Sequence, residues 1–194
     1  MPSSKLDEWL REVRACRACE AHLPYAPKPV LRAAATARIL LVGQAPGRRV
    51  HETGIPWNDP SGDRLRDWMQ VSRDIFYDEG RIAIIPTGFC YPGTGKGGDL
   101  PPRPECAPLW HPRLHELLPD VRLTLLVGSY AQAYYLGKRC QKTLTETVHH
   151  YRDYLPEFLP LPHPSPRNQM WLKRNPWFAE EVLPLLRREV ARLL

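Results

Sequence analysis

Four of the five cysteines in this 194-residue chain are spaced like the ligands of a metal centre. Cys16 and Cys19 form a C-x2-C pair, and Cys90 and Cys106 form a second, wider pair. Two pairs of thiolates suit a tetrahedral zinc site or an iron–sulfur cluster, and the spacing alone does not choose between them. Four buried thiols without a metal are the alternative. Cys140 has no partner in this pattern and is interpreted as an ordinary buried cysteine.

Two Gly- and Pro-rich segments hold the other residues that could do chemistry. The segment 43–65 opens with Gly-Gln-Ala-Pro-Gly and closes with Asp-Pro-Ser-Gly-Asp-Arg-Leu, and residues 163–168 read His-Pro-Ser-Pro-Arg-Asn. Their histidine and carboxylates are possible acids, bases and hydrogen-bond donors. Each segment alone is a weak signal, because Gly-Pro turns are common.

Short apolar runs alternate with amphipathic segments and predict the scaffold for these residues. The apolar runs predict strands buried on both faces, at 38–43, 82–85, 123–127 and 158–161. Helical spacing predicts helices at 5–16, 61–71, 105–118, 129–137 and 176–193, the first capped by Ser4. The alternation implies a parallel sheet covered on both faces by helices. Ligands of such sheets bind at the carboxyl ends of the strands, in this chain the loops 44–61, 86–103, 128–130 and 162–175.

The composition indicates one globular domain, residues 1–194, of ordinary size. With 43% hydrophobic and 25% charged residues, the chain has no apolar run near the ~18 residues of a membrane span. Residues 1–16 carry charges where a secretory signal is apolar, so we expect a cytoplasmic protein without a disulfide framework.

The net charge of +6 is compatible with a nucleic-acid partner. Most of the basic residues are arginines. The guanidinium of arginine can donate two hydrogen bonds to one phosphate and can stack on bases. The 22 prolines fall between the apolar runs rather than in one tract. This distribution predicts rigid loops on a compact scaffold.

Together, the two Gly- and Pro-rich segments resemble the signature loops of the uracil-DNA glycosylase superfamily. Residues 43–47 resemble its G-[EQ]-x-P-G opening, and residues 54–57 resemble the G-x-P-aromatic element of the iron–sulfur branch. Residues 59–65 resemble the D-x-S-G-D-x-L of type-b members, with a one-residue deletion after Trp57. Residues 163–168 match the HPSPRN of the single-strand-selective monofunctional uracil glycosylases letter for letter. The resemblance covers nearly the whole chain.

The resemblance implies a three-layer αβα sandwich with a central four-stranded parallel sheet. It implies a monomer that flips a base out of DNA and hydrolyses the N-glycosidic bond of uracil or another deaminated or damaged base. It also implies that Cys16, Cys19, Cys90 and Cys106 hold a [4Fe-4S] cluster, with zinc as the alternative. The cluster would be structural, joining the first helix to the loop after the second strand.

Cleavage of an N-glycosidic bond creates positive charge on the sugar and negative charge on the departing base, so the site needs donors near the base oxygens. By resemblance, His163 faces a base oxygen, with a histidine merely bonded within its turn as the alternative. Backbone N–H groups of the 44–47 turn are further donors.

Water activation is assigned by resemblance to Asp59. The best-known relatives have Asp or Asn at the position of Ala45, which can activate nothing, whereas type-b enzymes share the alanine and use the aspartate that maps to Asp59. An aspartate before a proline could also be only a turn former. Gln44, Asp63 and His51 are the reserve candidates; Asp63 could simply favour the first turn of a helix.

Trp57 stands where the related enzymes stack a phenylalanine on the extruded base, with a core tryptophan as the alternative. Their base-reading asparagine maps to Pro86, whose side chain has no donor or acceptor. Either Thr87 or the main chain then pairs with the base, or the substrate is not uracil. Gln44 and Ala45 complete the predicted base site.

Contact with DNA is expected from backbone groups and basic side chains of both loops. The predicted contact residues are Pro46, Gly47, Arg48, Ser165, Pro166, Arg167, Asn168 and Lys173. Pro166, Arg167 and Met170 could fill the gap left by a flipped base. The glycine-rich segment 93–98 lacks the spacing of a P-loop and is predicted to be a flexible, basic loop on the substrate side.

Neither signature loop places a lysine for a Schiff base, which favours a monofunctional glycosylase. Two other classes of function stay open. Ala45 and Pro86 favour a protein of this fold that binds damaged or single-stranded nucleic acid without cutting it. The cysteines alone would also suit an iron–sulfur redox protein.

Overall fold

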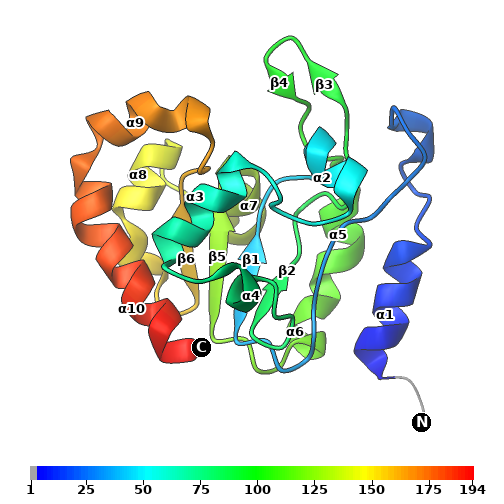
Figure 1. Ribbon diagram of the computed structural model, residues 1–194, viewed down its shortest axis with the longest axis horizontal. Coiled ribbons are helices and arrows are strands. Elements are labelled where there is room, and N and C mark those ends of the chain that lie inside the picture. Colours follow the sequence, from blue (N-terminus) through cyan, green and yellow to red (C-terminus); the bar gives the residue numbers. More distant parts are fainter. Residues whose placement is uncertain (1–3) are drawn as a thin grey trace.

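The computed structural model describes residues 4–194 and has a parallel sheet of four strands at its centre (Figure 1). The strands lie in the order β2-β1-β5-β6, and every pairing between them is parallel. Their bounds are β1 (Ile39–Val42), β2 (Ile82–Ile84), β5 (Leu123–Val127) and β6 (Phe158–Leu161). The four predicted strands are confirmed, and so is the αβα fold. Pro160 is tolerated in β6 because β6 is an edge strand.

One face of the sheet packs against α3, α8 and α10. Ile39 and Leu41 of β1 point to this face and join a buried cluster with side chains of these helices. The helices are α3 (Pro60–Met69), α8 (Leu144–His149) and α10 (Leu183–Leu193), with the single-turn α4 (Arg73–Phe76) nearby.

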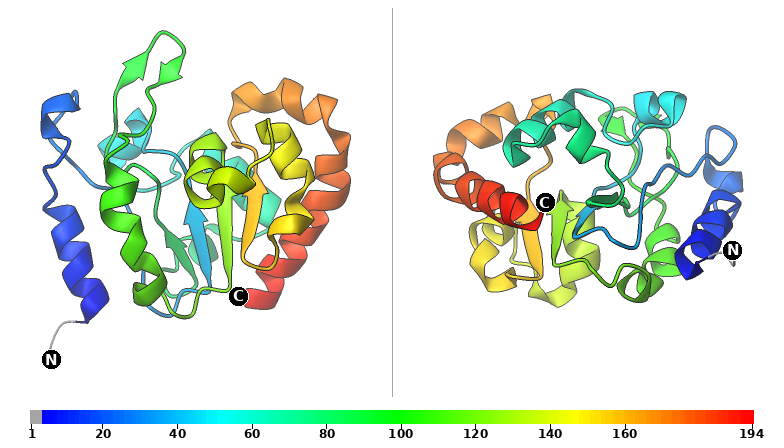
Figure 2. Two further views of the ribbon diagram at one scale, coloured as in Figure 1. Left: turned by 180° about the vertical axis from the view of Figure 1, so that it is seen from behind. Right: turned by 60° about the horizontal axis from the view of Figure 1, so that its bottom comes forward.

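The opposite face packs against α1, α5, α6 and α7. Leu40 and Val42 point to it because successive side chains of a strand alternate between faces. The helices are α1 (Lys5–Arg14), α5 (Cys106–Trp110), α6 (Leu114–Leu117) and α7 (Ser129–Leu136). Ser4 caps α1 as predicted, in a capping box with Asp7. Figure 2 shows α1 as the outermost element on this side of the molecule.

Two predicted helices are interrupted, in both cases near a proline. The helix predicted at 105–118 is divided into α5, a 3-10 turn (His111–Arg113) and α6, with Pro112 inside the turn. The helix predicted at 176–193 begins with a π-helical segment (Phe178–Val182) before α10. Pro184 lacks the N–H that a regular α-helix would use there.

Several short elements lie where no helix or strand was predicted. They are α2 (Arg48–Thr53), α9 (Gln169–Arg174) and a hairpin of β3 (Thr94–Gly95) and β4 (Gly98–Asp99), together with α4 and α8. Elements this short show no periodicity, although the Thr143-x-x-Glu146 capping box that starts α8 was visible in the sequence. The segment 93–98, predicted to be a flexible, basic loop on the substrate side, contains two short strands that pair as an antiparallel hairpin.

The four parallel strands end on the same side of the sheet, which we call its carboxyl edge. The hairpin β3–β4 lies beyond this side (Figure 1). The start of α1 and the carboxyl terminus lie at the other edge. Within residues 4–194, no helix is long and apolar enough to cross a membrane.

A buried amide joins α7 to the carboxyl ends of two strands. Nε2 of Gln132 donates to the carbonyls of Leu126 in β5 (3.3 Å) and Leu161 in β6 (2.9 Å). The side chain is 2% exposed. It therefore fixes the point from which the loop after β6 departs.

We expect Gln132→Ala to lower the free energy of unfolding by about 2 to 3 kcal/mol, because it leaves a cavity and two poorly satisfied carbonyls. Urea denaturation measures the change. Gln141→Ala is the control, because Gln141 is exposed, and should change stability by less than about 0.5 kcal/mol. Equal effects of the two substitutions would contradict the role of Gln132.

Candidate functional site

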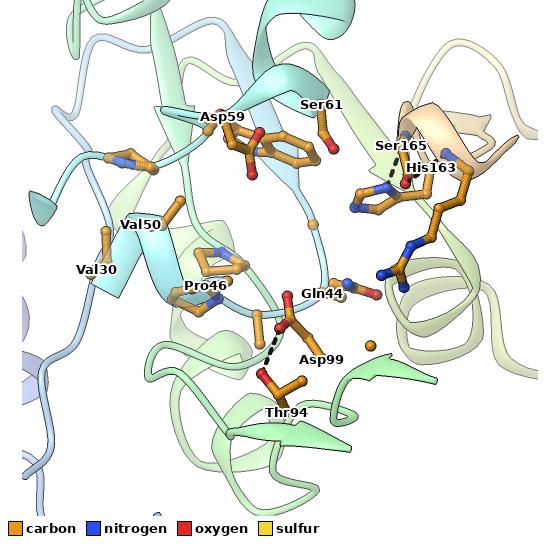
Figure 3. Close-up of a pocket in the computed structure, with 18 of the residues that line it drawn as sticks. Val30, Gln44, Pro46, Val50, Asp59, Ser61, Thr94, Asp99, His163 and Ser165 are labelled. Carbon is orange, nitrogen blue, oxygen red and sulfur yellow. Dashed lines mark hydrogen bonds between the residues drawn. The ribbon is translucent and has the colours of Figure 1, made fainter. Parts of the chain in front are cut away.

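A cavity of about 420 Å³ lies at the carboxyl edge of the sheet (Figure 3). Its walls come from the loops after β1, β2 and β6 and from the hairpin. It adjoins the point where the strand order reverses between β1 and β5, where open parallel sheets bind ligands. The cavity gathers nine of the predicted site residues, namely Gln44, Ala45, Pro46, Gly47, Trp57, Asp59, His163, Ser165 and Arg167.

Thr87 stabilises the turn after β1 through hydrogen bonds to its backbone carbonyls. Its Oγ1 donates to the carbonyl of Gln44 (2.8 Å) and also lies 3.2 Å from the carbonyl of Gly43. The backbone N–H groups of Thr87 and Gly88 bond to the same two carbonyls. Thr87 was predicted to pair with a base, but its buried side chain shapes the turn and is not part of the cavity wall.

Trp57 is held in a strained backbone conformation against two glycines. Its φ of 56° lies in the left-handed region, and its carbonyl accepts from Nη1 of Arg66 (3.3 Å). A Cβ added at Gly62 would lie 1.7 Å from that carbonyl oxygen, and one added at Gly43 would lie 2.8 Å from the indole. The indole lines the cavity, 5.6 Å from the ring of His163 and inclined to it by 31°.

Asp59 caps α3 and also lines the cavity. Its Oδ1 accepts from the N–H of Gly62 (2.8 Å), which is the turn-forming role considered from the sequence. Of the three reserve residues, Gln44 lines the cavity, whereas Asp63 and His51 lie outside its wall. Asp63 forms an ion pair with the buried guanidinium of Arg66, and His51 stacks with Tyr25 at a ring distance of 5.2 Å.

His163 is arranged as a neutral hydrogen-bond donor. Its Nδ1 accepts from the backbone N–H of Ser165 (3.2 Å), so the ring proton is on Nε2. Burial lowers the pKa of His163, while the charge of Asp59 acts in the opposite direction. Nδ2 of Asn168 donates to the carbonyl of His163 (2.7 Å), and Gly128, with φ 87°, packs against the ring. Figure 3 shows the bond to Ser165.

The remaining predicted DNA contacts lie around the cavity rather than in its wall. Pro166 and Lys173 are exposed beside the loop after β6, and Arg48 pairs with Glu52 (3.0 Å) on the surface of α2. Arg167, which does line the cavity, reaches across to the hairpin, where its Nη1 donates to the carbonyl of Gly97 (2.9 Å).

The hairpin contributes wall residues that the sequence analysis did not single out. Thr94 and Asp99 line the cavity opposite the loop that carries Asp59. Burial raises the pKa of Asp99, and Thr94 lies within hydrogen-bond distance of it (3.4 Å). The visible signal was an acid directly after the glycine-rich run 93–98.

Pro86 forms part of the cavity wall and is held by a buried histidine. Nε2 of His111 donates to the carbonyl of Pro86 (2.9 Å), and the hydroxyl of Tyr135 donates to Nδ1 (2.8 Å). Burial lowers the pKa of His111 to about 4. A neutral His111 therefore supports this wall.

The four paired cysteines line a second, small and mostly apolar cavity. This cavity joins the segment after α1 to the loop after β2 and to the start of α5. The N–H of Phe89 donates to Sγ of Cys106 (3.4 Å), and burial raises the pKa of Cys90 to about 11 and of Cys106 to about 12. Among residues 4–194, no three histidine, cysteine or acidic side chains converge closely enough to hold a single metal ion.

Cys140 lies apart from this group. Its Sγ donates to the carbonyl of Gln132 (3.4 Å), and its side chain packs against the core cluster on the α7 face of the sheet.

Comparison with known proteins identifies what this architecture is similar to. The model of the uracil DNA glycosylase superfamily matches residues 31–187. A solved structure with the same fold is the solution NMR structure of a protein from Methanosarcina acetivorans that is provisionally named a uracil DNA glycosylase. The two chains are 17% identical with a TM-score of 0.50, over 83% of this chain and 98% of that one.

The neutral state of His111 predicts a loss of stability in acid. Its pKa is about 4 in the folded protein and about 6.5 in an unfolded chain, so below pH 6.5 the unfolded state binds a proton that the folded state does not. Stability is therefore lost as the pH falls from 6.5 to 4, by up to about 3 kcal/mol.

Urea denaturation of wild type and His111→Gln at pH 7.5 and 5 measures this effect. The variant should be less stable at pH 7.5 and should lose less stability between the two values. His115→Gln removes an exposed histidine and should keep the wild-type dependence. An unchanged pH dependence in His111→Gln would show that His111 is not responsible.

Proposed function

Since the chain belongs to the uracil DNA glycosylase superfamily, we propose that it hydrolyses the N-glycosidic bond of uracil or another deaminated or damaged base in DNA. One observation carries the proposal. Loops separated by about a hundred residues bring His163, with its Nε2 proton, and the carboxylate of Asp59 to the same cavity. An anion stabiliser and a carboxylate are the two groups that this reaction needs.

The base enters the cavity after it is flipped out of the DNA and stacks on the indole of Trp57. As the C1′–N bond breaks, its electron pair moves onto the base. Nε2–H of His163 donates to the base oxygen where negative charge develops. The bond from Ser165 is important because it holds the proton on Nε2.

We assign the orientation of the attacking water to Asp59, which lines the cavity. One carboxylate oxygen is occupied by the N–H of Gly62, which leaves the other oxygen for water or for the positively charged sugar. The water oxygen bonds to C1′, and its proton passes to Asp59 and then to solvent or to the released base. Ala45 cannot act as a general base. The turn around it shapes the cavity and contributes backbone N–H groups.

No lysine lines the cavity within residues 4–194, which supports a monofunctional reaction without a Schiff base. DNA crosses the carboxyl edge of the sheet, where the exposed Arg48, Pro166 and Lys173 flank the cavity together with Ser165, Arg167 and Asn168. We propose that the protein acts on DNA as a monomer in the cytoplasm.

We further propose that the protein belongs to the iron–sulfur branch and that Cys16, Cys19, Cys90 and Cys106 hold a [4Fe-4S] cluster. The four cysteines line one small cavity, and Sγ of Cys106 accepts a backbone N–H there, as a cluster-bound thiolate would. Burial raises the pKa of Cys90 and of Cys106, and the positive charge of bound iron would offset this cost of forming thiolates. A single zinc ion at ~2.3 Å from each sulfur requires thiolates that converge on one point. The four cysteines line one cavity, and the resemblance to the iron–sulfur branch favours the cluster over zinc. The cluster would cross-link the segment after α1 to the sheet.

A second candidate is a protein of the same fold that binds damaged or single-stranded DNA without cutting it. Ala45 and Pro86 support this candidate, because both line the cavity and neither side chain can activate water or hydrogen-bond to a base. Such a protein would still hold a flipped base in the cavity, but it would release no base.

Excision assays test the enzymatic proposal. Wild-type protein should release a base from single- or double-stranded oligonucleotides that contain uracil, hypoxanthine or xanthine. Asp59→Asn keeps a side chain that caps α3, so it should fold normally but lose about 10²- to 10⁴-fold in rate. His163→Ala should lose about 10²- to 10³-fold.

Asp67→Asn is the matched control for these variants, because it changes an exposed aspartate of α3 and should excise like wild type. Full activity of Asp59→Asn would refute the role of Asp59. Tight binding of these oligonucleotides by the wild type without release of any base would instead support the second candidate.

Metal analysis of anaerobically purified protein tests the cluster. About four irons and four sulfides per chain are expected, and Cys106→Ala should lose them and lower the melting temperature. Cys140→Ala should keep both properties, because Cys140 lies outside the cysteine cavity. One zinc per chain would identify a zinc site. A reversible reduction potential that controls excision would favour a redox role over a structural one.

A further inference from the structure

Asp99 places a second carboxylate in the wall of the large cavity. It comes from β4 of the hairpin and lies opposite the loop that carries Asp59 (Figure 3). A Cβ atom added at Gly47 would lie 3.0 Å from Oδ2 of Asp99, so the hairpin packs closely against the turn after β1. Asp99 is therefore a built part of the cavity and not the end of a free loop.

Two hydrogen-bonding contacts hold Asp99 and its hairpin in this position. Thr94, on the paired strand, lies 3.4 Å from its Oδ1. Arg167 donates to the carbonyl of Gly97 and so ties the tip of the hairpin to the loop after β6. Burial raises the pKa of Asp99, which agrees with a side chain that faces the cavity as well as solvent.

Most other polar side chains of the wall already have structural partners. Oδ1 of Asp59 accepts from Gly62, Nδ1 of His163 accepts from Ser165, and Oγ of Ser165 accepts from the N–H of Arg167. Within residues 4–194, no hydrogen bond joins the Gln44 amide side chain to another protein group. Asp59 and Asp99 each keep one carboxylate oxygen without a hydrogen bond from the described residues, and that of Asp59 is assigned to the attacking water. Gln44 and Asp99 therefore remain to bind a base edge.

The charge of Asp99 indicates which part of a nucleotide it faces. A carboxylate repels the phosphate backbone, whereas on a base it can accept a hydrogen bond from an N–H group. The same cavity also holds a complementary donor, Nε2–H of His163. A donor and an acceptor together match an edge on which a carbonyl adjoins a ring N–H.

Such an edge distinguishes deaminated bases from their parents. Uracil has a ring N–H where cytosine has an acceptor nitrogen, and hypoxanthine differs from adenine in the same way. Pro86 has no hydrogen-bonding side chain, and the hydroxyl of Thr87 is bonded to backbone carbonyls, so neither can make this distinction with its side chain.

We propose that Asp99 is a specificity-determining residue, delivered by the hairpin, that accepts the ring N–H of a flipped lactam base and disfavours cytosine and adenine. This inference rests on the proposed glycosylase function and adds to it the residue that reads the base edge. It makes the hairpin part of the base site, although the sequence analysis interpreted its glycine-rich core as a loop.

Two variants of Asp99 test the assignment in excision assays and in a binding assay. The binding assay uses oligonucleotides with a single 2′-fluoro-2′-deoxyuridine or 2′-fluoro-2′-deoxycytidine, whose glycosidic bonds resist hydrolysis. Asp99→Ala should reduce kcat/KM on uracil by about 10- to 100-fold and should remove the binding preference for the fluorinated uridine. Asp99→Asn keeps an acceptor oxygen and should stay within a few-fold of wild type in both assays.

Asp67→Ala removes an equal charge from the exposed surface of α3 and should match wild type, and melting temperatures show whether each variant folds. An unchanged uridine preference in folded Asp99→Ala would overturn the inference. So would loss of turnover in both variants with normal binding, because Asp99 would then act on the water.

The binding assay separates this inference from the proposed function. A wild type that excises nothing but prefers the fluorinated uridine, with the preference lost in Asp99→Ala, would end the catalytic proposal and leave the base-reading role intact. A wild type that shows neither excision nor preference would overturn both.

Discussion

Burial of β1 between two parallel neighbours governs the rest of this structure. β1 lies between β2 and β5, and helices cover both of its faces, so its backbone polar groups have no water to bond and the ladder must be complete. Parallel strands end at the same edge of a sheet. Every loop that follows a strand is therefore brought to that edge, and the reversal of strand order beside β1 leaves room there for a ligand.

The chemistry at this edge depends on small backbone contacts more than on long side chains. The turn after β1 is held by Thr87, the strained Trp57 fits because residues 43 and 62 are glycines, and the N–H of Ser165 sets the tautomer of His163. Each contact fixes the position of a group at the cavity. A fixed dipole stabilises developing charge more strongly in a site that excludes water than it would in bulk solvent. Pre-organisation of this kind suits a reaction in which charge separates between sugar and base.

Two peripheral segments are joined to this centre by different means. The hairpin is secured by a single arginine and a close approach to Gly47, so it packs against the cavity while most of its residues remain exposed. The segment after α1 meets the sheet at the four cysteines, among apolar residues and prolines. A cluster bound there would stabilise the outer layer without entering the cavity in which the base would bind.

The sequence by itself determined the sheet, most of the covering helices and the two loops that meet at the cavity. These features come from local patterns: continuous apolar runs, helical spacing, caps and Gly-Pro turns. Tertiary structure decided the rest. Thr87 was predicted to face a base and instead supports a turn, because two carbonyls lie within reach of its hydroxyl. Asp99 entered the cavity wall only because a glycine-rich segment folds into a hairpin and packs against Gly47. Contacts between residues distant in sequence leave little periodic signal, so the direction in which these side chains point could be known only from the folded chain.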